Sequence, residues 1–182
     1  MPLPKLTGAQ IAWLNQQVAA YIDHQRRSFL RGTAPLSQNQ RTVVQPFFPD
    51  STLNSARLVV LKVIRVSNPP FYSELLNMGF EAGSLPDFAH MAAITFVDTI
   101  VSHEPFTNRL LFHELVHVVQ YEKLGLKDFA AKYVRGFLSS GSYEAIPLEM
   151  NAYELEGRYT AAPTKAFSVE AEVQAWIEEG RF

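Results

Sequence analysis

Cysteine is absent from this chain of 182 residues, and its absence excludes several kinds of chemistry. Without thiols the protein cannot form disulfides, use a thiolate as a nucleophile or hold zinc through sulfur ligands. Any transition metal must therefore be bound by histidine, aspartate or glutamate side chains.

An excess of charge of one sign is also lacking. The chain has 16 Lys and Arg against 18 Asp and Glu, which leaves a net charge of −2 at pH 7. Proteins that bind nucleic acid through its phosphates concentrate positive charge on one face, and this composition offers no such concentration. We therefore expect no nucleic-acid partner.

Long apolar runs are missing as well. No segment approaches the roughly 20 apolar residues that a membrane-spanning helix needs. Residues 1–8, MPLPKLTG, lack the apolar stretch that is typical of a secretory signal peptide. The sequence predicts a cytoplasmic protein without a membrane partner, and it leaves the oligomeric state open.

The composition otherwise predicts one folded domain. Hydrophobic residues make up 47% of the chain and charged residues 19%, which supplies enough apolar side chains for a core and too little charge for a disordered chain. The length is typical of a single domain. We therefore expect residues 1–182 to form one domain, which begins with an amphipathic helix within residues 1–31.

Apolar periodicity predicts the elements of an α+β fold. Strands are expected over residues 56–66 and 91–101, where β-branched and apolar side chains predominate. Residues 38–51, which contain two prolines, predict a loop or an irregular edge strand. Helices are expected, from apolar spacing and capping residues, over residues 7–30, 72–78, 106–124, 127–138, 147–157 and 169–179. Because strands precede a block of helices, we expect a small mixed or antiparallel sheet packed on helices.

The pattern HELVH, an H-E-x-x-H motif, lies within the helix expected over residues 106–124. His113 and His117 are four residues apart, so they share one face of a helix and both imidazoles can reach one ion. Glu114 is rotated by about 100° from His113 around the helix. That places Glu114 beside an open position of the ion, where its carboxylate can act on a bound water as a base.

Apolar residues surround the motif and predict that its helix is buried. Two histidines and a carboxylate are costly to bury without a positive charge between them. This favours a metal site over the other interpretation, in which two ordinary, partly buried histidines lie on an amphipathic helix. The flanking apolar positions are Leu110, Leu111, Leu115, Val118 and Val119.

Two segments, LFHELVHVVQYE and IPLEMNAYELE, resemble the zincin metallopeptidases. They are most similar to gluzincin-like members, whose third ligand is a glutamate, and to uncharacterised bacterial HExxHxxQ proteins. The resemblance covers residues 91–158, the expected metal-site core. It implies a zincin-like fold, a strand before the motif helix, and one zinc ion per chain that is held by His113, His117 and Glu149.

The chain departs from the gluzincin pattern at one position. The pattern E-x-x-A-D has an aspartate that supports a zinc-bound histidine through its second ring nitrogen, and Tyr153 stands in that place here. Because ligand histidines usually need such a partner, Asp98 and Asn151 become candidates for the role. The resemblance also implies that Gln120 forms a hydrogen bond near the site.

The residues themselves favour Glu149 as third ligand less sharply than the resemblance does. Ala152, close to one turn further on, is small enough to let its helix approach the motif helix closely. A His₂Glu set is one of the known catalytic zinc arrangements. The alternatives are Glu144, Glu154 and Glu156, which could equally lie on a solvated helix face.

These residues predict a zinc-dependent metallopeptidase that acts on a peptide or protein substrate. A metal-activated water would attack the peptide bond, with Glu114 as general base. The developing oxyanion needs a further donor, for which Tyr143 is the first candidate and Tyr153 and Tyr133 are alternatives. A second hypothesis is a catalytically inactive, metal-stabilised interaction module with the same fold, which Tyr153 and the small size of the chain favour. The third is a metal-free helical protein in which the motif is a coincidence.

Overall fold

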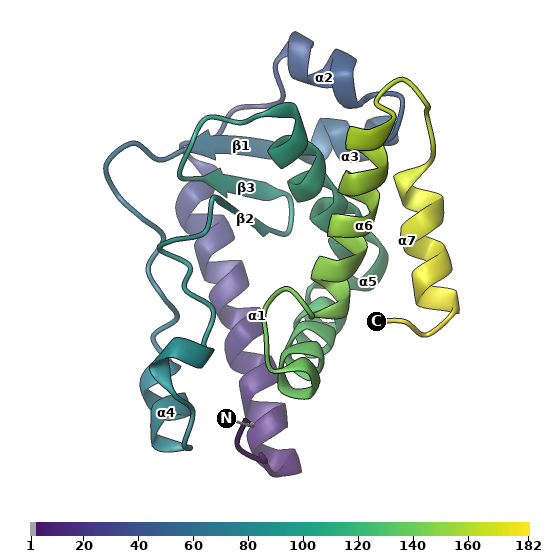
Figure 1. Ribbon diagram of the computed structural model, residues 1–182. Helices are drawn as coiled ribbons and strands as arrows, with labels where there is room; N and C mark the ends of the chain where they lie inside the picture. Colours follow the sequence, from purple (N-terminus) through teal and green to yellow (C-terminus); the bar gives the residue numbers. More distant parts are fainter. Residues whose placement is uncertain (1–2) are drawn as a thin grey trace.

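The computed structural model describes residues 3–182, and it confirms the expected α+β class: helices surround a small three-stranded sheet (Figure 1). In chain order the elements are α1 (Gly8–Leu30), α2 (Gln38–Val44), α3 (Asp50–Ser55), β1 (Arg57–Val60), α4 (Tyr72–Asn77), the 3₁₀ turn η1 (Ala82–Ser84), β2 (Ala93–Phe96), β3 (Thr99–Ser102), α5 (Asn108–Ser140), α6 (Pro147–Ala161) and α7 (Val169–Glu178). None of these helices is both long and apolar enough to cross a lipid bilayer.

The sheet has the strand order β1-β3-β2, with β1 parallel and β2 antiparallel to β3. The single strand expected over residues 91–101 is wrong, because the chain reverses at Val97 and Asp98 to form a hairpin. Val97 has a φ of 64°, a backbone conformation that such tight hairpins need and that a β-branched residue rarely adopts. Arg26 of α1 stabilises the turn, since its guanidinium donates two hydrogen bonds to the Asp98 carboxylate, at 2.7 and 2.6 Å.

Two other expectations about the first third of the chain are wrong. Residues 38–51, expected as loop or strand, begin with α2, because Ser37 and Gln40 form a reciprocal capping box at its start. The strand expected over residues 56–66 ends at Val60, where its parallel pairing with β3 ends. Beyond that point the chain leaves the sheet, and Val63 has a side chain that is 92% exposed.

The later helices lie close to their expected positions. The helices predicted over residues 106–124 and 127–138 are the two halves of α5, which bends at Gly125. Gly125 has a φ of 74° and a ψ of 161°, so its backbone is not helical. The expected helix over residues 72–78 is α4, and the last two expected helices are α6 and α7.

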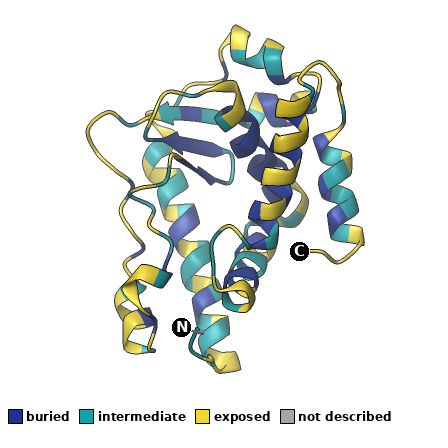
Figure 2. Cartoon of the chain, viewed as in Figure 1, coloured by how far each residue is buried: buried dark blue, intermediate teal, exposed yellow. Residues whose placement is uncertain are grey.

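Helix α5 is the centre of the molecule. It packs against α1, α6, α7 and β2, and Figure 1 shows the sheet across the upper end of α1, with α6 in front of α5 and α7 at the right. Every residue from Leu111 to Tyr121 is buried, which is typical of a helix with neighbours on all sides. Figure 2 shows this burial in the strands and in the first half of α5. The HELVH motif therefore lies inside the protein.

Candidate metal centre

Two helices bring three metal-binding side chains together. His113 and His117 lie one turn apart on the first half of α5, and Glu149 lies in the first turn of α6. Their exposed fractions are 6%, 6% and 4%. These three residues, the ones that the sequence and the resemblance had indicated, form a buried group that could hold a metal ion.

The start of α6 can approach α5 closely because position 136 carries no side chain. A Cβ atom on Gly136 would lie 2.7 Å from Cδ of Pro147 and 3.1 Å from Cγ2 of Ile146. Pro147 is the first residue of α6 and fits there because the first turn of a helix leaves its N–H groups without intrahelical partners. Glu149, two residues later, is thereby placed opposite the motif histidines.

The three donor atoms form a nearly equilateral triangle. The Nε2 atoms of His113 and His117 are 3.2 Å apart, and Oε2 of Glu149 is 3.5 and 3.4 Å from them, respectively. A tetrahedral zinc ion with bonds of about 2.0–2.1 Å separates its ligand atoms by about 3.3–3.4 Å. The triangle therefore has the size of one face of a tetrahedral zinc site, and the fourth corner is left for another ligand.

Hydrogen bonds fix which ring nitrogens face this triangle. Nδ1 of His113 donates to the Glu156 carboxylate at 2.9 Å, and Nδ1 of His117 donates to Oε1 of Gln120 at 2.9 Å. The Gln120 amide cannot be turned the other way, because its Nε2 donates to the Leu148 carbonyl oxygen and to another side-chain oxygen, each at 2.9 Å. In the neutral rings both Nε2 atoms therefore carry a lone pair, as metal ligands must.

The triangle is unfavourable without a positive charge. It consists of three electron-pair acceptors, and Oε2 of Glu149 is buried with no hydrogen-bond donor within residues 3–182. Burial lowers the pKa of His113, but the nearby carboxylates of Glu149 and Glu156 outweigh it and raise the pKa to about 10. Burial likewise raises the pKa of Glu149, but His117 and His113 hold it well below its usual range. Both shifts have one cause, which is the attraction between a protonated imidazole and the buried carboxylates.

The partner of His113 is a residue that the sequence had suggested for another role. Glu156 was considered above as an alternative third ligand. Its carboxylate accepts one hydrogen bond from Nδ1 of His113 and another from Nε of Arg109. Burial raises the pKa of Glu156, but these two partners outweigh burial and leave the pKa below its usual value. Of the two residues proposed for this role, Asp98 is bound by Arg26 at the β2–β3 turn, and Asn151 contacts Gln120 instead.

Tyr153, which stands in place of the aspartate of the gluzincin pattern, covers the ring of His113 instead. The ring centroid of Tyr153 lies 4.6 Å from that of His113. Glu156 is seven residues after Glu149, two turns along the same face of α6, so the carboxylate is present one turn later than the E-x-x-A-D pattern places it. The remaining alternatives for the third ligand, Glu144 and Glu154, are exposed and lie outside the donor triangle.

Glu114 is buried beside the triangle without being part of it. Its Oε2 accepts a hydrogen bond of 2.7 Å from Oγ1 of Thr95, on strand β2. Sequence reasoning missed Thr95, because a threonine in a strand is common and nothing local shows that it faces the motif helix. The bond holds one carboxylate oxygen in place.

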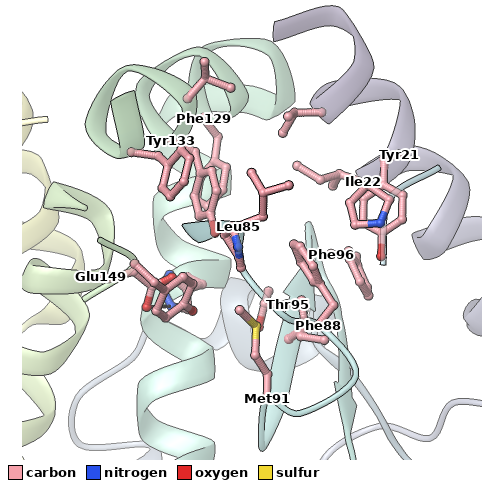
Figure 3. Close-up of a pocket in the computed structure, with 18 of the residues that line it drawn as sticks. Tyr21, Ile22, Leu85, Phe88, Met91, Thr95, Phe96, Phe129, Tyr133 and Glu149 are labelled. Atoms are coloured by element: carbon pink, nitrogen blue, oxygen red, sulfur yellow. Dashed lines mark ion pairs between the residues drawn. The ribbon is translucent and has the colours of Figure 1, made fainter. Parts of the chain in front are cut away.

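Two hollows meet at the donor triangle. A polar cleft of about 840 Å³ is lined by His113, Tyr153 and charged residues. An apolar cavity of about 90 Å³ lies on the His117 side (Figure 3). Glu114 and Tyr143 line both, so the candidate base stands where they join.

The three tyrosines proposed as oxyanion donors lie in different places. Tyr143 lines both hollows, and burial together with the charge of Glu149 raises its pKa well above the usual value, so its hydroxyl keeps its proton. Tyr153 lines the cleft alone, and Tyr133 lines the apolar cavity alone. Tyr143 therefore stays the first candidate for the donor.

Comparisons of this chain with family models, with curated proteins and with solved structures found no match.

Proposed function

We propose that this chain is a zinc-dependent metallopeptidase with a zincin-like fold, in which His113, His117 and Glu149 hold one zinc ion. The observation that carries the proposal is the donor triangle, whose sides of 3.2–3.5 Å match the ligand spacing of tetrahedral zinc. Each histidine also has a hydrogen-bond partner at Nδ1, as ligand histidines in metalloproteins almost always do. Mixed nitrogen and oxygen donors in this geometry suit zinc better than calcium or magnesium.

The chain supplies the other groups that hydrolysis of an amide needs. Held by His113, His117 and Glu149, a zinc ion would supply a Lewis acid that acidifies a water and polarises a carbonyl group. The Glu114 carboxylate accepts the proton of the attacking water and delivers it to the leaving nitrogen. Thr95 orients that carboxylate through Oε2, and the protonated hydroxyl of Tyr143 donates to the carbonyl oxygen as negative charge develops on it.

A peptide fits the cleft better than a compact small molecule does. The cleft is about 840 Å³ and runs past Ala92 and Ala93, at the start of β2. Within residues 3–182, β2 pairs with β3 alone, so its other edge keeps backbone groups that an extended peptide could bond. These features support peptide or protein substrates.

The test is a pair of measurements on the Glu114→Gln variant. We expect it to retain about one zinc per chain by elemental analysis, because Glu114 is not in the donor triangle. Peptidase activity on casein and on a peptide library should fall by a factor of about 10²–10⁴, the usual contribution of a general base. Chelator-sensitive cleavage by the unaltered protein is the control. Persistent activity in the variant would overturn the mechanism.

The same experiment separates the proposal from an inactive, metal-stabilised module. Absence of cleavage, together with a large drop in Tm when a chelator removes the metal, would indicate that module. Tyr153 in place of the aspartate of the gluzincin pattern favours an inactive module less than the sequence suggested, because Glu156 supplies a carboxylate to His113. Purified protein without bound metal would point to the coincidental motif instead.

A further inference from the structure

The apolar cavity on the His117 side lies between the metal-site core and helix α1, which is outside that core. Helix α1 contributes Leu14, Val18 and Ile22, and the second half of α5 contributes Phe129 and Phe137. At its inner end the cavity reaches the donor triangle. Figure 3 shows Glu149 at one end and Tyr21 with Ile22 at the other, against α1.

Away from the donor triangle, two of the tyrosines that line this cavity have their hydroxyls bonded to backbone carbonyl oxygens. The hydroxyl of Tyr21 donates to the Ser67 carbonyl at 2.7 Å, and that of Tyr72 donates to the Pro86 carbonyl at 2.8 Å. These residues therefore present their rings to the cavity. A cavity with apolar walls stays dry and gains free energy when an apolar group enters.

The volume limits what that group can be. A cavity of about 150 Å³ lined by aliphatic and aromatic side chains accommodates benzene, and this one measures about 90 Å³. It therefore fits an aliphatic group of about three to five carbon atoms and is too small for an indole ring or a fatty acyl chain.

This cavity and the cleft share part of their walls. Leu85, Met91 and Tyr143 line both hollows, as does Glu114. The thioether side chain of Met91 is flexible and can adapt to a passing group. A side chain of a peptide in the cleft can therefore enter the cavity while the adjacent peptide bond stays beside the donor triangle.

We infer that this cavity is a specificity pocket, walled by α1, which accepts an aliphatic side chain of the size of valine, leucine, isoleucine or methionine next to the bond that is cleaved. The inference rests on the proposed peptidase function and adds a substrate class to it. Val18 is the position to vary, because it lines the pocket from α1, a helix that carries none of the residues that would bind metal or move protons.

The experiment uses alkyl hydroxamates of increasing chain length, from acetohydroxamate to octanohydroxamate, on the zinc-loaded protein. Their affinities are measured by calorimetry. We expect affinity to rise by about fourfold per methylene, the usual gain for burying such a group, and to stop rising after three to five carbons. An affinity that is independent of chain length would overturn the inference.

Substitutions in α1 test whether the gain in affinity with chain length comes from this pocket. Val18→Phe should abolish the gain with chain length, whereas Ala20→Phe, on the exposed face of the same helix, should retain it. Val18→Ala should move the best chain length up by one or two carbons, and it keeps the test decisive if Val18→Phe does not fold. Identical chain-length profiles in all three variants would overturn the role of Val18.

The two proposals fail in distinguishable ways. If hydroxamates show the length dependence and no peptide is cleaved, the peptidase function fails and the pocket stands. If a peptide library is cleaved without preference for aliphatic residues beside the cleaved bond, the pocket fails and the peptidase stands. If no hydroxamate binds to the zinc-loaded protein, both fail.

Discussion

The two histidines of the donor triangle have unlike surroundings. On the side of His113 the hydrogen-bond partner is a carboxylate, Glu156, which is paired in turn with Arg109 and borders the polar cleft. On the side of His117 the partner is a neutral amide, Gln120, next to the apolar cavity. His113 thus has a charged partner beside a polar cleft, and His117 has a neutral partner beside an apolar cavity.

The difference shows how the surroundings of each histidine decide whether its hydrogen-bond partner is a carboxylate or a neutral amide. A carboxylate makes a ligand histidine more basic, but a buried carboxylate needs a compensating cation. Arg109 can supply that cation at the cleft, where its own side chain is 68% exposed. No lysine or arginine of residues 3–182 lines the apolar cavity. An amide there fixes the orientation of His117 without adding a charge that nothing would compensate.

The most severe way to break this difference is to place a charge on the neutral side. Gln120→Glu removes the amide donor to Leu148 and Asn151 and buries a carboxylate against their oxygens. We expect the free energy of unfolding of the metal-free protein to fall by about 2–4 kcal/mol, measured by urea denaturation at pH 7. Gln16→Glu, on an exposed position of α1, is the matched control. Equal stability of the two variants would contradict the neutral character of this side.

Removing the charge from the partner of His113 should have a smaller effect, on metal affinity more than on folding. In Glu156→Gln the amide oxygen can still accept from Nδ1 of His113, so the geometry is kept and the charge is lost. We expect zinc affinity, measured by competition with a chromophoric chelator, to fall by about 10–100-fold. Glu154→Gln, on the exposed face of the same helix, should leave the affinity unchanged. An unaltered affinity in Glu156→Gln would show that the carboxylate does not act on the metal through His113.

The smallest effect is expected from Arg109, which contacts Glu156 and, through it, His113. Arg109→Met leaves Glu156 without its cation, but water in the cleft screens much of the loss. We expect zinc affinity to fall by less than about tenfold, since Arg109 acts through a partner of the ligand, and the difference from the unaltered protein should shrink as salt is added. Lys127→Met, an exposed position on α5, removes the same charge elsewhere. A salt-independent loss would show that Arg109 acts through packing.

Local spacing made part of this site predictable. His113, Glu114 and His117 belong to one helical turn, and helix geometry alone places them. Glu149 came from the resemblance, and residue spacing by itself left other glutamates open. Glu156 could not be assigned its role, because its contact with His113 depends on how α6 packs on α5.

The difference between local signals and contacts between distant segments also explains which parts of the fold were missed. The capping box of Ser37 and Gln40 is a local signal, and α2 could have been found from it. The hairpin at Val97 gave no such signal, because neither glycine nor asparagine marks the turn. That turn is instead stabilised from a distance by Arg26 of α1. Thr95 also acts across elements, so only the folded chain could reveal it.

The missing side chain at Gly136 has a consequence for the choice of metal. The atom that a Cβ there would strike belongs to the ring of Pro147, which cannot swing aside as a flexible side chain could. An alanine would push the first turn of α6 outward and enlarge the space between Glu149 and the histidines. The size of the ion that the donor triangle could hold is therefore set partly by a residue that is not one of its three members.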